Sequence, residues 1–158
     1  MRPIPVAAAR VLIASLCCVA GLAWAQEVTV SDAWARATVT GQKASAVFMK
    51  LTAKDNAKLV GVSTPVAGVA EIHQMKMDDN VMKMSSVPAL DLPAGKAVEL
   101  KPGSYHLMLM DLKAPLLKDT TVPVTLTLED AKGVKSQLKI DVPVASQQPM
   151  MHDHGMHY

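Results

Sequence analysis

The stretch Tyr105-His106-Leu107-Met108-Leu109-Met110-Asp111-Leu112 decides how this chain is expected to fold. Side chains of a β-strand alternate between its two faces, so Leu107 and Leu109 share one face with Tyr105. His106, Met108 and Met110 then project from the opposite face. Because the leucine face belongs in a hydrophobic core, the imidazole and the thioethers are expected on the far face of the sheet or at its edge.

Short runs with the same alternation recur along the chain, and turn residues separate them. Asp78-Asp79-Asn80 sits between two runs as a tight hairpin turn would, and Asp130-Ala131-Lys132-Gly133 joins the last pair. Beyond residue 25, no stretch keeps the period of about 3.6 residues that a helix requires. The pattern predicts an all-β fold, a Greek-key antiparallel sandwich. The expected strands are 28–30, 44–51, 59–62, 70–77, 81–87, 97–100, 105–112, 122–128 and 134–142.

The first residues have the features of an export signal. Arg2 and Arg10 flank the start of an apolar run that ends in Ala23-Trp24-Ala25, a small-x-small cleavage site. The run is shorter than the about 20 apolar residues that span a bilayer. We therefore predict that residues 1–25 are a cleaved signal peptide, and that the protein has no stable membrane insertion.

Both cysteines, Cys17 and Cys18, lie inside the predicted signal peptide. The residue directly ahead of Cys17 is Leu16, where a lipoprotein signal needs a small residue, so lipidation is not expected. The mature chain then has no disulfide, no thiolate metal site and no thiol nucleophile. Any soft-metal chemistry in it must use methionine, of which the chain has 11.

Composition and charge exclude several classes of protein. The chain is 50% hydrophobic and 19% charged, which is typical of a globular protein rather than a disordered one. Its formal net charge is +2 without a basic run, so nucleic acid is not an expected partner. No Ser/His/Asp set, glycine-rich phosphate loop or pair of carboxylates is evident, so the protein is not expected to be an enzyme.

Histidines and methionines fall together on the expected strands. In the run 70–77 one histidine shares a face with two methionines, and two more methionines share a face in the run that follows. Copper(I) prefers thioether and imidazole donors, whereas magnesium and calcium prefer oxygen and structural zinc prefers Cys or more His. The acidic residues nearby, Glu71 among them, look like turn and surface positions. These donors predict a copper(I) site: His73, Met75, Met77, Met82, Met84, His106, Met108 and Met110.

The spacing of four donors resembles that of a known family. His73 is followed after ten residues by Met84, then after twenty-one residues by His106 and after one residue by Met108. This pattern, H-x10-M-x21-H-x-M, is similar to the signature of the periplasmic PCu(A)C copper chaperones. Four surrounding segments resemble that family too: Glu71-Ile72-His73, Val81-Met82-Lys83-Met84, Leu92-Pro93-Ala94-Gly95 and Lys101-Pro102-Gly103-Ser104-Tyr105-His106-Leu107-Met108-Leu109.

The resemblance implies a cupredoxin-like sandwich over residues 26–145 that binds one copper(I) through His73, Met84, His106 and Met108. It also implies delivery of copper to the binuclear copper centre of cytochrome c oxidase subunit II, directly or with a Sco-type thiol protein. Strand phase alone does not distinguish Met84 from Met82, because both share a face. It likewise does not distinguish Met108 from Met110. The open positions are Met75, Met77, Met82 and Met110.

Residues 146–158 are expected to form a flexible tail rich in histidine and methionine. Imidazole clusters bind copper(II) as well as copper(I), so the tail is a candidate for a second copper ion. This leaves an alternative function, a periplasmic storage or resistance protein that sequesters copper through its tail. A blue-copper electron carrier is excluded, because it needs a cysteine thiolate. The tail donors are Met150, Met151, His152, His154, Met156 and His157.

Overall fold

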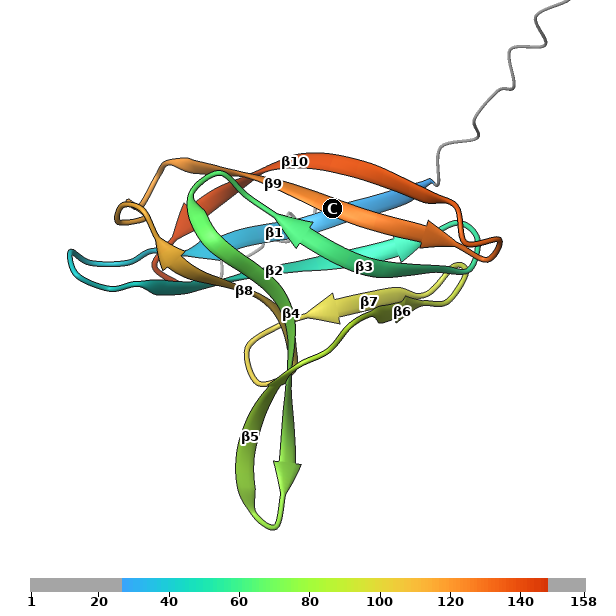
Figure 1. The fold of residues 1–158 in the computed structure, drawn as a ribbon, viewed down its shortest axis with the longest axis horizontal. Coiled ribbons are helices and arrows are strands. Elements are labelled where there is room, and N and C mark those ends of the chain that lie inside the picture. Colours follow the sequence, from blue (N-terminus) through green and yellow to red (C-terminus); the bar gives the residue numbers. More distant parts are fainter. Residues whose placement is uncertain (1–26, 148–158) are drawn as a thin grey trace, which may run out of the picture.

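The computed structural model describes residues 27–147, and its regular elements are all β-strands (Figure 1). The predicted signal peptide, and the predicted tail from residue 148 onward, lie outside the described residues. Within residues 27–147, no helix is long and apolar enough to cross a membrane. The strands are β1 (Val28–Arg36), β2 (Ala44–Ala53), β3 (Ala57–Ser63), β4 (Ala67–Asp78), β5 (Val81–Ser86), β6 (Leu90–Leu92), β7 (Ala97–Leu100), β8 (Tyr105–Leu112), β9 (Thr121–Asp130) and β10 (Lys135–Ala145).

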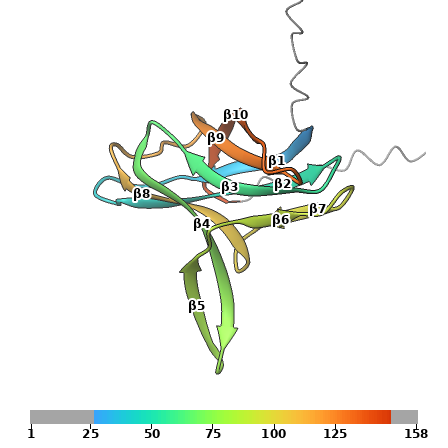
Figure 2. The ribbon, with the colours of Figure 1, turned by 45° about the vertical axis from the view of Figure 1, so that its right-hand side comes forward.

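Hydrogen bonding orders the strands as β5-β4-β8-β7-β2-β1-β10-β9-β3-β6. Most neighbouring strands are antiparallel, as predicted, but the end of β1 runs parallel to the end of β10, and β7 meets β8 in parallel. In both views β9 and β10 lie above β1 and β2, with the core between the layers (Figures 1 and 2). The predicted all-β class is confirmed.

The core is built mainly from leucine, valine and alanine side chains of both layers. In β8, Leu107 and Leu109 have no exposed surface, and Ile72 of β4 lies opposite Leu107. From the other layer, β9 contributes Leu126 and Leu128. The prediction that Leu107 and Leu109 face the core is confirmed, and the histidine and methionines of that strand lie on its other face.

Most predicted strands have ends that shift by one to three residues, and two strands differ more, each for a local reason. β1 continues to Arg36, past a bulge between Ser31 and Trp34 in which Asp32 has a φ of +54°. A bulge adds an unpaired residue and so interrupts the alternation on which a sequence pattern depends. β6 is three residues long, and a run that short has almost no periodicity to detect.

The end of β4 and all of β5 form a hairpin that extends away from the other strands (Figures 1 and 2). We call this hairpin, residues 73–86, the arm. Asp78 pairs with Val81, so the turn has two central residues, Asp79 and Asn80, with φ of +46° and +60°. Positive φ at both positions is the geometry of a tight hairpin turn that favours Asn and Asp. The turn predicted at this point of the sequence is confirmed.

Candidate metal site

Two paired strands bring the histidines of the described chain together. His73 of β4 lies directly opposite His106 of β8 in an antiparallel register, so both side chains are on the same face. Their ring centroids are 5.7 Å apart, with the ring planes tilted by 59°. Their neighbours Ile72 and Leu107, one step along the strands, point into the core. The two imidazoles therefore sit on the outer face, with 8% and 6% of their surface exposed.

Methionines surround this histidine pair on the same face. Met75 of β4 lies opposite Met84 of β5 and two residues after His73, so it is on the same face as that histidine. Met108 lies two residues after His106 and opposite Glu71. An open pocket of about 340 Å³ is lined by His106 together with Met75, Met84 and Met108. Three of the four residues expected as ligands thus share one pocket with a spare methionine, and His73 lies beside it.

His73 has one ring nitrogen in use and one without a partner. Its Nε2 lies 2.9 Å from a carboxylate oxygen of Glu71, so the Nε2–H donates to that oxygen. Its Nδ1 is buried and has no hydrogen-bond partner within residues 27–147. In the neutral ring with hydrogen on Nε2, Nδ1 carries a lone pair. A buried polar atom without a partner costs about 1–3 kcal/mol, so a lone pair left in this state calls for a bound group.

His106 is held in a different environment. Its Nδ1 lies 3.4 Å from the carbonyl oxygen of Ser104, so the Nδ1–H faces that acceptor and the lone pair falls on Nε2. Burial is the main cause that lowers the pKa of His106 below 6.5, and the nearby His73 and Arg36 act in the same direction. The ring is therefore neutral at pH 7, which is the state that binds a metal ion.

Aromatic side chains form the wall behind His106. Phe48 of β2 lies 6.3 Å from the His106 ring and 4.7 Å from the ring of Trp34, between centroids. Trp34, Phe48 and Ala46 are buried as a small cluster separate from the main core. The guanidinium of Arg36 lies over Phe48, 5.4 Å from its ring centroid. Sequence alternation did not identify this wall, because the bulge in β1 shifts Trp34 into phase with Phe48.

The donor set of the described chain lacks the elements of a hard-metal site. Within residues 27–147, no three His, Cys, Asp or Glu side chains come together in a way that could hold a metal ion. The other donor side chains that line the pocket with His106 are the thioethers of Met75, Met84 and Met108. Thioether and imidazole donors favour copper(I) over magnesium, calcium or structural zinc.

Two expectations about this region need refinement. Glu71, interpreted as a surface position, is indeed 44% exposed at its side chain, yet it holds the ring of His73. The sequence feature that could have identified this role of Glu71 is its position two residues before His73, which puts both side chains on the same face of the strand. Met82 and Met110, by contrast, do not line the pocket that contains Met84 and Met108.

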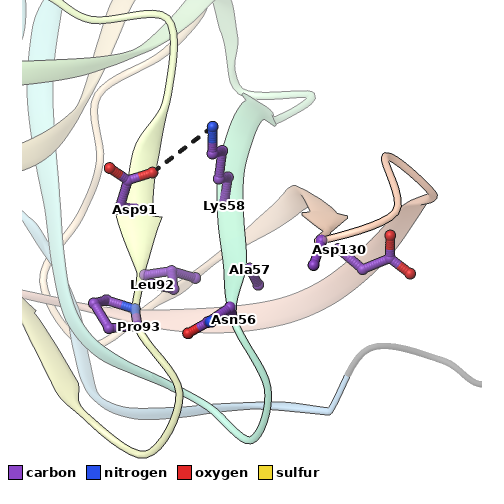
Figure 3. A pocket seen from close by; sticks show the side chains of 8 residues that line it. Asn56, Ala57, Lys58, Asp91, Leu92, Pro93 and Asp130 are labelled. Atoms are coloured by element: carbon purple, nitrogen blue, oxygen red, sulfur yellow. Dashed lines mark ion pairs between the residues drawn. The ribbon is translucent and has the colours of Figure 1, made fainter.

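A second pocket lies at the far end of the strand order, beside β3 and β6 (Figure 3). Its volume is about 390 Å³. It contains an ion pair of 4.0 Å between Lys58 and Asp91, and Asn56 accepts a hydrogen bond from the backbone of Ala94 at its rim. It has neither histidine nor methionine in its lining, so it offers no donor for a soft metal.

Comparison with protein families and curated proteins gives three matches. The model of the family described as putative lipoprotein LpqE-like matches residues 28–144. Putative lipoprotein Lxx21020 of Leifsonia xyli subsp. xyli (strain CTCB07) is 33% identical over 121 residues, which cover 76% of this chain and 70% of that protein. Uncharacterized protein RP573 of Rickettsia prowazekii (strain Madrid E) is 34% identical over 122 residues, 73% of this chain and 65% of that protein.

Solved structures with the same fold include PCuAC domains. The solution structure of CuI-DR1885 from Deinococcus radiodurans is 31% identical with a TM-score of 0.56, covering 78% of this chain and 82% of that chain. The apo PCuAC domain from PmoF1 has a TM-score of 0.62 at 24% identity, covering 76% of this chain and 94% of that domain. These neighbours have a cupredoxin-like β fold, and the predicted fold class is confirmed at this level too.

Proposed function

The chain belongs to the LpqE-like family, and from this membership we propose that it is a periplasmic copper chaperone. It binds one copper(I) ion on the outer face of β4, β5 and β8 and passes it to another protein. The observation that carries the proposal is the Nδ1 of His73, which has no partner within residues 27–147 and is buried beside the imidazole of His106. A copper-bound relative of the same fold, CuI-DR1885, supports the choice of metal.

The proposed ligands are Nδ1 of His73, Nε2 of His106 and the sulfur atoms of Met84 and Met108. The hydrogen bonds to Glu71 and to the Ser104 carbonyl support this choice of nitrogens, because each leaves the lone pair on the other atom of the ring. The pocket that Met84 and Met108 share with His106 supports these two methionines over Met82 and Met110. Met75 lines the same pocket, and the spacing of the resembled family selects Met84 over it.

The donors suit transfer rather than storage in a closed site. All four are neutral, and a thioether leaves copper without taking up a proton, so ligands can exchange one at a time. Met84 is 50% exposed on the arm, where an incoming protein can replace it first. We propose that the copper centre of cytochrome c oxidase subunit II receives the ion, directly or through a Sco-type thiol protein. The protein acts by binding and release, and not as an enzyme.

Anaerobic titration with copper(I) against a chromophoric chelator tests the proposed ligands. We expect His106→Ala and Met108→Ala to lose most of the copper(I) affinity while the far-UV circular dichroism spectrum is retained. Met110→Ala is the matched control, because Met110 is on the same face of β8 but outside the pocket. X-ray absorption of the protein loaded with less than one equivalent of copper(I), which fills the tightest site first, should count two nitrogen and two sulfur neighbours. Unchanged affinity in both ligand variants would remove the proposed site.

Deletion of residues 146–158 separates this function from sequestration by the tail. The deletion leaves every strand intact, because β10 ends at Ala145. A chaperone should still bind copper(I) at the histidine site of its folded domain. A protein that stores copper in its tail should lose most of its capacity.

A further inference from the structure

The two faces of the arm differ in chemistry. The arm is a two-stranded hairpin in which residues directly opposite share a face. One face carries two cross-strand methionine pairs, and the other is mainly polar. The methionine face consists of Met75, Met77, Met82 and Met84, and the other face of Gln74, Lys76, Asp78, Val81, Lys83 and Ser85.

The outer methionines of the arm are not part of a core. Met77 is 59% exposed and Met82 is 44% exposed, so neither gains much from burial of its side chain. Methionine is not among the residues enriched in strands, where β-branched and aromatic side chains fit best. Packing and strand propensity therefore leave the presence of two opposed methionines unexplained. What they provide at this position is a pair of thioether sulfurs.

The register places these two sulfurs within reach of one ion. Met77 lies directly opposite Met82, and such pairs have Cβ atoms about 4.5–5.5 Å apart. Each side chain has three rotatable bonds, so the sulfur atoms can converge on a common point. The two-residue turn and the ion pair between Lys83 and Asp78, on the opposite face, hold the register. We call this pair of thioethers near the tip of the arm, Met77 and Met82, the clamp.

We propose that Met77 and Met82 form a second site for a soft monovalent ion, copper(I) or silver(I), that is separate from the histidine site. Thioethers select such ions and bind magnesium, calcium and zinc poorly. The pair Met75 and Met84 lies between the clamp and His73 on the same face. An ion held at the tip therefore has a continuous row of sulfur donors toward the histidine pair. The clamp rests on the geometry of the arm alone, whereas its use as the point of entry rests on the proposed function.

Silver(I) titration of the full mature chain tests the clamp, because silver(I) does not change oxidation state. The chain is labelled with ¹³C at the methionine methyl groups, and Met→Leu variants assign each NMR signal. The methyl signals of Met77 and Met82 should shift together in one step of the titration. In Met77→Leu the shift of Met82 should be lost, while the matched variant Met110→Leu should leave both shifts unchanged. If the Met82 signal shifts equally in Met77→Leu, or if neither signal shifts at saturation, the clamp does not exist.

The same spectra separate failure of the clamp from failure of the histidine site. In His106→Ala, the joint shift of Met77 and Met82 should persist, because the clamp uses no imidazole. Loss of that shift in His106→Ala, at saturating silver(I), would show that the arm has no site of its own. Conversely, an arm that binds silver(I) in a protein whose Met108 signal never moves would support the clamp and contradict the proposed function. Signals of the tail methionines are assigned separately, so silver(I) bound there does not obscure either result.

Discussion

The Nε2 of His73 lies 2.9 Å from the carboxylate of Glu71, two residues earlier on the same face of β4. This hydrogen bond assigns the ring proton, orients the imidazole and increases the electron density at Nδ1. A carboxylate that holds a ligating histidine in this way is a common partner of metal sites. Glu71 is thus a positioning residue of the proposed copper site, although it does not itself contact the metal.

Glu71→Gln should lower copper(I) affinity by about 10–100-fold, the usual effect of removing such a partner. The neutral amide is a weaker acceptor and leaves the ring of His73 less firmly held. Competition with a copper(I) chelator measures the change. Glu99→Gln is the control, because Glu99 is paired only with the surface residues Lys50 and Lys101. Equal affinities of the two variants would show that Glu71 has no role in the site.

Burial of His106 makes the stability of the metal-free protein depend on pH. Its pKa in the folded state is below 6.5, so the unfolded chain binds the proton more readily. This contribution is absent at high pH, where the ring is neutral in both states. As the pH falls below 6.5, His106 takes up a proton in the unfolded chain but not in the folded protein, and this difference lowers the free energy of unfolding. The loss ends once the pH is below the pKa of His106 in the folded protein. Urea unfolding between about pH 8 and pH 5 should show this loss of free energy of unfolding. A His106→Gln variant should show a smaller loss, and an identical slope in both proteins would contradict the effect.

Leu107→Ala should destabilise the protein by about 2–5 kcal/mol, because it opens a cavity in the core behind the histidine pair. Leu107 has no exposed surface. The control Leu117→Ala removes a side chain that is 61% exposed and should change stability by less than about 0.5 kcal/mol. Chemical denaturation of the metal-free proteins measures both. A small effect at Leu107 would mean that the core face of β8 is misassigned.

Asn80→Val should loosen the arm, because a β-branched residue is strained at the φ of +60° found there. The cost is about 1–3 kcal/mol, concentrated in the hairpin. Amide hydrogen exchange should accelerate in β5 and remain unchanged in β9. Copper(I) affinity should fall too, because Met84 is held by the arm.

Asn80→Gly, which accepts the same φ without strain, should keep both the protection and the affinity. Faster exchange in Asn80→Gly than in Asn80→Val would contradict the assigned turn geometry.

The sequence predicted the parts of the fold that repeat locally. The alternation of leucine with His106 and Met108 is strong, and it identified both faces of β8 before any contact was known. The Asp79-Asn80 turn was equally clear, because few residues accept positive φ at two successive positions. The parallel contact between the ends of β1 and β10 was not predicted, because it joins Ala35 to Val144 and no local pattern records such a distant pairing.

The candidate site was predicted in its residue types but not in its arrangement. Strand phase placed His73 and His106 each on a methionine-bearing face. The sequence does not contain the register between β4 and β8. That register places the two faces side by side on one surface of the sheet and sets the two imidazole rings opposite each other. The roles of Glu71 and Phe48 depend on contacts between side chains, which alternation does not encode.

The lysines of the arm have a consequence for how the protein behaves in solution. β5 is the last strand at one end of the sheet order, and an exposed final strand invites pairing with another molecule. Lys76 places positive charge on the side of the arm away from the methionines, beside the ion pair of Lys83 with Asp78, and charged side chains at a sheet edge discourage pairing of two molecules. The charged face of the arm therefore opposes self-association, while Met77 and Met82 stay exposed on the other face.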